Sequence, residues 1–213
     1  IYSGYYGALA SDAVLTEVEF AEGMTRIPQY ICSNANTVEK IVIPSTVTSI
    51  GDYAFNNCSS LNEIKLPDSL INIEARAFSK CSNLKSVTIP GNVASIGDYA
   101  FSDCDSLVAN VYNNSTGLTY CKDNNIDYKI VGIYDESSDI QIENGTCTNI
   151  DESTELKVNQ LKEGNDYDVV SKSFDNFELY DLSFYKDDQK VTIDGTAIVR
   201  IPVKEGMDGS KCK

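Results

Sequence analysis

The sequence predicts a solenoid of short parallel β-strands over residues 1–132, followed by a small all-β domain over residues 133–213. Three observations favour this fold class. The segment IGDYAF begins at Ile50 and again at Ile96, 46 residues further on. A looser copy, IEARAF, begins midway between them at Ile73, so the repeat is 23 residues long. From about Tyr134 the period disappears, and short β-branched or aromatic segments alternate with Gly, Asn and Asp turns.

One short strand is expected in each repeat. The pattern L-x-x-I-x-I ends in alternation and contains β-branched residues, which is typical of a half-buried strand. Four segments of the chain fit it: residues 15–20, 38–43, 61–66 and 84–89. Pro44, Pro67 and Pro90 follow the last three segments. Proline ends a strand because it has no backbone N–H to donate.

A second apolar column is expected to fill the side of each turn opposite the strand. It consists of three Ala-Phe pairs: Ala54-Phe55, Ala77-Phe78 and Ala100-Phe101. One 23-residue turn cannot bury its own apolar side, but stacked turns about 4.8 Å apart bury it against one another. A period of this length with this skeleton is typical of a leucine-rich-repeat solenoid. Gly51 and Gly97 are expected to occupy tight turns.

The complete motif L-x-x-I-x-I-P-x-x-V-x-x-I-G-x-x-A-F-x-x-C closely resembles the BspA-like class of leucine-rich repeats. Leu61 to Cys81 carry it, with Glu74 in place of the glycine, and Leu84 to Cys104 carry it again. The resemblance covers about residues 4–130. It implies a secreted or cell-surface bacterial protein that acts in adhesion or recognition.

Two departures from the motif modify this prediction. Tyr30-Ile31-Cys32 replaces Tyr-Ala-Phe and Ala35 replaces the repeat cysteine, so the second turn is atypical. The chain also begins inside a turn, with Ala8-Leu9 in the Ala-Phe columns. Because an open apolar edge is a liability, we expect the chain to begin within a longer solenoid.

A cap is expected where the pattern breaks after Leu107. Ser115 or Thr116 could begin a short helix that holds Leu118 and Cys121 on one side, and Asn124-Asn125 would end it. Residues 126–131 then alternate as a strand does. Closing segments of this kind cap solenoids in the resembling family, and a solenoid needs such a cap to cover its last apolar face.

The seven cysteines are interpreted mainly as packing groups. Three of them lie 23 residues apart, one per turn: Cys58, Cys81 and Cys104. Three equivalent thiols cannot all pair and the total is odd, so buried thiols are favoured over disulfides. No C-x-x-C is present, which argues against a zinc ribbon. Cys121 is expected to face the cap interior. A disulfide between Cys147 and Cys212 is an alternative that the sequence does not decide.

The second region is predicted to be an immunoglobulin-like β-sandwich. Because the chain stops at Lys213, we expect either an incomplete sandwich or a longer protein. Five segments have strand character: 140–142, 155–158, 177–184, 191–193 and 197–203. The segments FELYDLSFY and IPVKEGMDGSKCK resemble small β domains that follow such repeats in surface proteins of gut Firmicutes. Acidic clusters near Asp135, Asp151 and Asp187 offer calcium ligands, but no D-x-D-x-D-G loop accompanies them. A solvated acidic surface is the better interpretation.

Composition argues against several classes of function. The net charge is −15, so binding to nucleic acid or directly to an anionic membrane is not expected. The chain has no histidine, which removes the commonest general base and the Ser-His and Cys-His pairs. We therefore expect no catalytic residue, no metal and no cofactor.

The candidate binding residues lie between the apolar positions of each strand, where side chains point outward. They form two columns: Glu17, Lys40, Glu63 and Ser86, and Glu19, Val42, Lys65 and Thr88. Stacked strands of solenoids form extended binding surfaces. The alternative is that Glu and Lys merely satisfy their cross-strand neighbours. Four or five strands give on the order of 300 Å² of surface, well below the roughly 800 Å² per partner of a standard interface, so weak binding is expected.

The predicted function is a non-catalytic, extracellular adhesion or protein-binding module. It would be a monomer, and its partner would be a host or bacterial surface protein or a glycan. Two alternatives stay open: an accessory or spacer region of a larger secreted enzyme, and a structural stalk.

Overall fold

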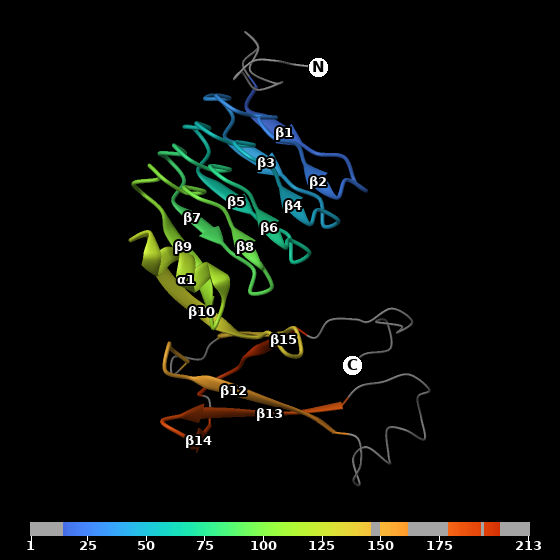
Figure 1. Ribbon diagram of the computed structural model, residues 1–213, viewed down its shortest axis with the longest axis vertical. Coiled ribbons are helices and arrows are strands. Elements are labelled where there is room, and N and C mark those ends of the chain that lie inside the picture. Colours follow the sequence, from blue (N-terminus) through green and yellow to red (C-terminus); the bar gives the residue numbers. More distant parts are fainter. Residues whose placement is uncertain (1–14, 146–149, 162–178, 193, 201–213) are drawn as a thin grey trace. The chain divides into compact units, whose positions relative to one another are not determined.

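The computed structural model describes residues 15–145, 150–192 except 162–178, and 194–200. The chain divides into two compact units, residues 1–131 and residues 132–213 (Figure 1). The predictions for Ala8-Leu9, for Cys147 and Cys212, and for residues 177–178, 193 and 201–203 lie outside the described residues. Within the described residues, no helix has the length and apolar character of a membrane span.

The first unit is a β-solenoid whose strands recur once per coil. A three-residue strand forms one side of each coil: β1 Glu17–Glu19, β3 Lys40–Val42, β5 Glu63–Lys65 and β7 Ser86–Thr88. Neighbouring strands are parallel, with Glu17 opposite Lys40 and Glu63 opposite Ser86. The predicted parallel strands and their 23-residue register are therefore confirmed, with each strand limited to the central residues of its apolar segment.

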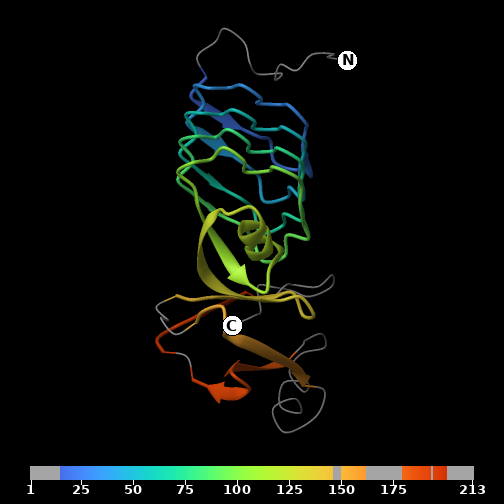
Figure 2. The same ribbon diagram turned by 60° about the vertical axis from the view of Figure 1, so that its left-hand side comes forward.

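A second row of strands was not predicted. Two-residue strands form it: β2 Arg26–Ile27, β4 Ser49–Ile50, β6 Asn72–Ile73 and β8 Ser95–Ile96. They pair in parallel in the order β2-β4-β6-β8, again with a 23-residue register. The isoleucine that ends each strand lies in the core, and Ile27 and Ile50 are fully buried. Each coil thus contributes two rungs to the stack (Figure 2).

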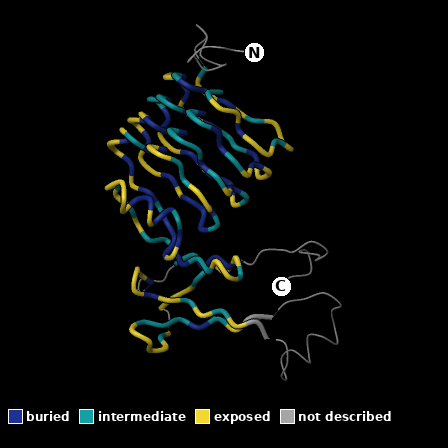
Figure 3. The backbone as a smooth tube through the Cα atoms, viewed as in Figure 1, coloured by how far each residue is buried: buried dark blue, intermediate teal, exposed yellow. Residues whose placement is uncertain are grey.

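Apolar side chains form one continuous core through the stacked coils. Buried residues recur in each coil (Figure 3). The Phe column forms its axis, with ring centroids 5.2 Å apart for Phe55–Phe78 and 5.1 Å apart for Phe78–Phe101. Cys32 takes the Phe position in the second coil and is fully buried. The ring of Phe20 packs edge-on against the ring of Phe55, with their centroids 6.1 Å apart. The two rings can meet across the second coil because Cys32 is smaller than phenylalanine. The atypical second turn therefore keeps the fold.

Gly51 and Gly97 need a correction. Neither has a positive φ, so the expected tight turn is wrong as the reason for glycine. A Cβ on Gly51 would lie 2.7 Å from the backbone N of Gln29, and one on Gly97 would lie 2.6 Å from that of Ala75. Glycine is favoured here because the backbone of the preceding coil approaches closely. Residues with a left-handed backbone do recur at the repeat period, two in each coil. They form two other columns: Tyr30, Tyr53, Arg76 and Tyr99, and Asn34, Asn57, Lys80 and Asp103.

Helix α1, Thr116–Asp123, closes the end of the stack beyond the last coil (Figure 2). The Ser115 hydroxyl accepts a hydrogen bond from the Leu118 N–H at 3.2 Å, and Asn124 caps the C-terminus. Leu118 and Cys121 are buried in the solenoid core. The predicted capping helix is confirmed, including its N-cap and the inward side of Cys121.

Strand β9, Val108–Asn113, was missed by the sequence analysis. It pairs in parallel with β7, placing Val108 opposite Ser86 and Asn110 opposite Thr88. These partners are 22 residues apart rather than 23, because one residue is lost after Leu107. The break in the pattern is thus a shortened repeat, not the end of the stacked strands. Strand β10, Asp127–Asp135, follows α1 and is longer than predicted.

The described part of the second unit is all β. Residues 132–135 of β10 pair antiparallel with β11 Ile140–Glu143, which pairs with β15 Ile198–Arg200. A second antiparallel sheet contains β12 Glu155–Leu161, β13 Leu179–Lys186 and β14 Gln189–Val191. Ile133 and Ile150 form a small buried cluster, with Leu156, Phe184 and Ala197 packed against it. The immunoglobulin-like arrangement stays a prediction.

Candidate binding surface

The eight predicted binding residues lie on one surface of the solenoid, here called the strand face. Each is the first or third residue of β1, β3, β5 or β7, while the middle residue of every strand is buried. Val42 is half-buried and the other seven are exposed: Glu17, Glu19, Lys40, Glu63, Lys65, Ser86 and Thr88. The two columns therefore do point away from the core, as the alternation of a strand requires.

One end of the strand face is held by an ion pair between neighbouring coils. The Lys40 Nζ lies 2.6 Å from Oε1 of Glu17, its register partner. This hydrogen bond and the charge of Glu17 raise the pKa of Lys40 above its ordinary value. Both side chains are more than half exposed, so solvent screens the pair and it adds little to stability. Glu17 and Lys40 thus satisfy each other across the strands, as the alternative interpretation holds, whereas Glu19 lies opposite Val42.

The other end is polar and uncharged. Asn110 of β9 donates through Nδ2 to the Ser86 Oγ at 3.2 Å and to the Thr88 Oγ1 at 3.3 Å. Asn110 and the exposed Val108 therefore extend the strand face by one strand. The sequence analysis missed both, although counting 22 residues from Ser86 and Thr88 would have found them.

Glu63 and Lys65 occupy the centre of the strand face. Both are exposed, and neither makes an ion pair with any other described residue. Cross-strand neutralisation therefore accounts for Glu17 and Lys40 but not for the central charges. The charges of Glu63 and Lys65 are therefore available to a partner.

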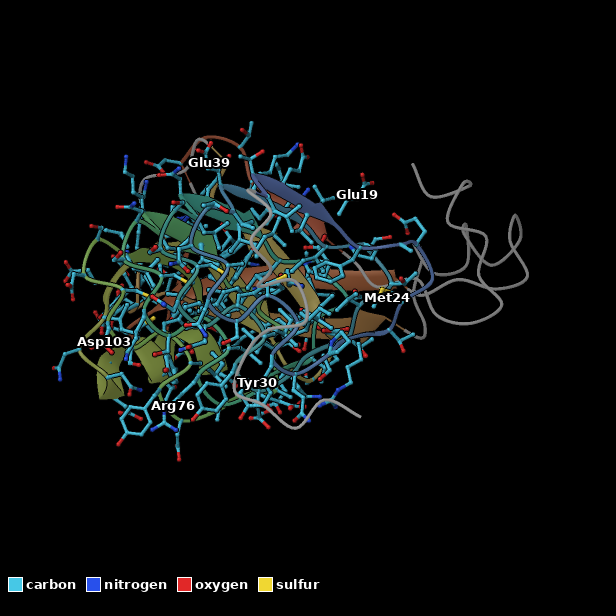
Figure 4. The ribbon with its side chains drawn as sticks, turned by 90° about the horizontal axis from the view of Figure 1, so that it is seen from above. Glu19, Met24, Tyr30, Glu39, Arg76 and Asp103 are labelled. Carbon is cyan, nitrogen blue, oxygen red and sulfur yellow. The ribbon has the colours of Figure 1, made fainter. Side chains whose placement is uncertain are left out.

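The side of the solenoid away from Glu19 and Glu39 carries a different column (Figure 4). The ring centroids of Tyr30 and Tyr53 are 5.0 Å apart with planes 13° from parallel. The guanidinium of Arg76 follows, 5.5 Å from the Tyr53 ring and 4.9 Å from the Tyr99 ring. We call these four residues the aromatic ladder. The sequence analysis did not identify it, although Tyr, Tyr, Arg and Tyr recur at the 23-residue period.

The thiols of Cys32, Cys58 and Cys121 are poor nucleophiles because the solenoid buries them. The five described cysteines are free and buried, which confirms their interpretation as packing groups. Burial raises the pKa of Cys32 and of Cys58 to about 12 and that of Cys121 to about 11. Such thiols stay protonated at neutral pH. The Sγ of Cys58 lies 3.2 Å from the Cys32 carbonyl oxygen, a weak hydrogen bond between coils. Among the described residues, no group of three His, Cys, Asp or Glu could hold a metal.

Stacked 23-residue coils with two parallel strand rows, a Phe axis and a helical cap are consistent with a leucine-rich-repeat solenoid. Residues 25–129 match the family described as BspA type Leucine rich repeat region, in six copies. No curated protein matches the chain.

Three bacterial structures are similar to part of the chain. A leucine-rich repeat protein from Bacteroides ovatus is 37% identical with a TM-score of 0.43, over 46% of this chain and 25% of its own. A leucine rich cell surface protein from Faecalibacterium prausnitzii is 23% identical with a TM-score of 0.41, over 49% and 34%. A leucine-rich repeat protein of T. pallidum is 24% identical with a TM-score of 0.39, over 51% and 60%. The chain thus spans about a quarter to three-fifths of the length of these proteins.

Proposed function

We propose that this chain is a non-catalytic, protein-binding module on the outside of a bacterial cell and that it acts in adhesion. The strand face is the observation that carries this proposal. Leucine-rich-repeat solenoids generally bind proteins on the extended surface of their stacked strands. In this chain that surface presents exposed charges at its centre and hydroxyl and amide groups at one end.

Binding rather than catalysis is supported by the side chains present. The chain has no histidine, and burial keeps the pKa of the Cys32 and Cys58 thiols at about 12. The commonest general base is therefore missing, and these two thiols do not supply a thiolate at neutral pH. The net charge of −15 also favours protein or glycan surfaces over nucleic acid as partners.

The partner class that fits is a host or bacterial surface protein, or a surface glycan. The strand face covers only on the order of 300 Å², less than half of one side of a standard interface. We therefore expect weak binding by the strand face of this chain, strengthened when several copies are presented together.

The experiment measures binding to an immobilised panel of host matrix proteins and bacterial wall glycans. The test variant is Lys40→Glu, Glu63→Lys and Lys65→Glu together, which reverses the two central charges and that of Lys40. The matched control is Lys122→Glu, Asp123→Lys and Lys129→Glu, which changes the net charge equally but lies on α1 and β10. We expect the test variant to weaken binding of one panel member at least about tenfold, equivalent to the loss of about 1.4 kcal/mol. Equal binding by both variants would place the site elsewhere.

A further inference from the structure

The aromatic ladder ends at a ring with one free face. Arg76 lies between Tyr53 and Tyr99, and its Nη1 donates to the Tyr53 hydroxyl at 2.9 Å. Members of the ladder follow one another along the stacking direction of the coils. Arg76 therefore occupies the face of Tyr99 that points back into the stack. Tyr99 belongs to the last coil of the ladder and is 56% exposed.

The backbone is built to present these rings. All four ladder residues have positive φ, between 53° and 58°, which is uncommon for residues other than glycine. This conformation costs free energy in a residue that has a Cβ. The stacked rings and the cation–π contacts offset part of this cost. The last member, Tyr99, receives such a contact on one face only.

A cavity of about 510 Å³ lies beside Tyr99, between the last coil and the C-terminal end of the cap. Tyr99, Asp103 and Asp105 line it from the coil, and Asn124 and Asp127 line it from the residues that follow α1. Its size lies within the roughly 300–1,000 Å³ range of ligand pockets. All of these residues belong to the first unit, so the cavity is a feature of the solenoid end itself.

The charged side chains that line the cavity are all acidic. Three carboxylates, from Asp103, Asp105 and Asp127, lie along its wall and are exposed. No lysine or arginine is found among the described residues that line it. A positively charged group entering the cavity would therefore meet carboxylates without competition from a resident cation.

We propose that this cavity binds an arginine side chain of a partner polypeptide. The guanidinium stacks on the free face of Tyr99, repeating the contact that Arg76 makes on the other face, and donates hydrogen bonds to Asp103, Asp105 or Asp127. Arg76 shows the same recognition within the chain, because its guanidinium stacks on Tyr99 at 4.9 Å. The site lies on a different part of the solenoid from the strand face and does not depend on that surface binding anything.

Arginine fits the cavity better than other cations. A guanidinium is planar, stacks on aromatic faces and donates bidentately to carboxylates. A lysine ammonium or a polyamine carries positive charge but has no planar group that could stack on the Tyr99 ring. A metal ion is not favoured, because no three His, Cys, Asp or Glu side chains among the described residues are arranged so that they could hold one.

The experiment titrates the whole chain with the peptide acetyl-Gly-Arg-Gly-amide, using the NMR signals of Tyr99 and its neighbours. Comparison ligands are the citrulline peptide, which keeps the shape and loses the charge, the lysine peptide, and spermidine. We expect saturable millimolar binding of the arginine peptide, about threefold weaker binding of the lysine peptide and none of the citrulline peptide. Equal binding of arginine and citrulline peptides, or tighter binding of spermidine than of the arginine peptide, would overturn the proposal.

Substitutions in and outside the cavity test which residues bind the arginine peptide. Tyr99→Leu should weaken binding of the arginine peptide about tenfold, while Tyr99→Phe should retain it. Tyr30→Leu, at the other end of the ladder, is the matched control and should leave affinity unchanged. Asp103→Asn with Asp105→Asn should weaken binding about tenfold, whereas Asp123→Asn on α1 should not. Unchanged affinity in Tyr99→Leu, with thermal unfolding showing a folded chain, would contradict the proposal.

Discussion

The two units of the chain bury their apolar residues in different ways. In the solenoid, buried side chains form one cluster that continues from Val18 to Cys121. In the described part of the second unit, the corresponding cluster centres on Ile133 and Ile150. A solenoid repeats the same contact from coil to coil, whereas a small β domain makes each contact once. The solenoid therefore gains stability from every coil and has a periodic surface from which a binding site can be built.

The largest expected difference between the units is the cost of removing a core ring. Phe78→Ala empties a fully buried site between two stacked rings and should cost about 3–5 kcal/mol. Phe184→Ala, in a half-buried site of the second unit, should cost less than half of that. Chemical denaturation followed by circular dichroism and tyrosine fluorescence measures both. Equal costs would show that the solenoid core is not the better packed of the two.

Alkaline pH should destabilise the solenoid through its buried thiols. Burial raises the pKa of Cys58 from an ordinary 9.0 to about 12. The folded state then holds its thiol proton more tightly than the unfolded state does. This contribution to stability is complete below pH 9 and is lost as pH rises towards 12. We expect the unfolding midpoint of the solenoid to fall over that range, and Cys58→Ala to show a shallower fall. A flat profile would contradict a buried, protonated thiol.

Acidic pH should act in the second unit, with a smaller effect. Lys186 and Ser153 donate hydrogen bonds to the Asp151 carboxylate and lower its pKa below the ordinary 3.8. The stabilisation is present above pH 3.8 and is lost as pH falls through the depressed value. Asp151→Asn should cost about 0.5–1 kcal/mol at pH 7, since the carboxylate is exposed, and measurably less at pH 2. Heteronuclear NMR of β12 and β13 signals against denaturant tests this. The same loss at both pH values would show that charge is not the cause.

Much of the solenoid could be predicted from the sequence, because each repeat carries the same pattern of apolar residues. The Leu and Ile positions, the Phe column and the Ser115 cap depend on residues close in sequence or exactly one period away. Strand β9 could not be found in the same way, because its partners are 22 residues from β7. The reason for Gly51 was also wrong, since it depends on the approach of Gln29 from the preceding coil.

The candidate sites were predictable to different degrees. The part of the strand face on β1, β3, β5 and β7 follows from alternation alone, so its eight residues could be placed, whereas Val108 and Asn110 on β9 could not. The aromatic ladder depends on left-handed backbone at Tyr30, Tyr53 and Arg76, which side-chain periodicity does not indicate. In the second unit, the pairing of Ile142 with Val199 joins strands that lie far apart in sequence. No repeat indicates that partner, so the strand segments could be predicted but their pairing could not.

Lysine acetylation footprinting tests most directly the claim that recognition belongs to the strand face. Lys65 lies at the centre of that face, and Lys190 of β14 is an exposed lysine of the second unit. The acetylation rates of both are measured by mass spectrometry with and without the panel member that binds the native chain. We expect saturating partner to slow acetylation of Lys65 at least about fivefold and to leave Lys190 unchanged, because a bound partner excludes reagent from the surface that it covers. Protection of Lys190 with no change at Lys65 would contradict the claim and would place recognition in the second unit.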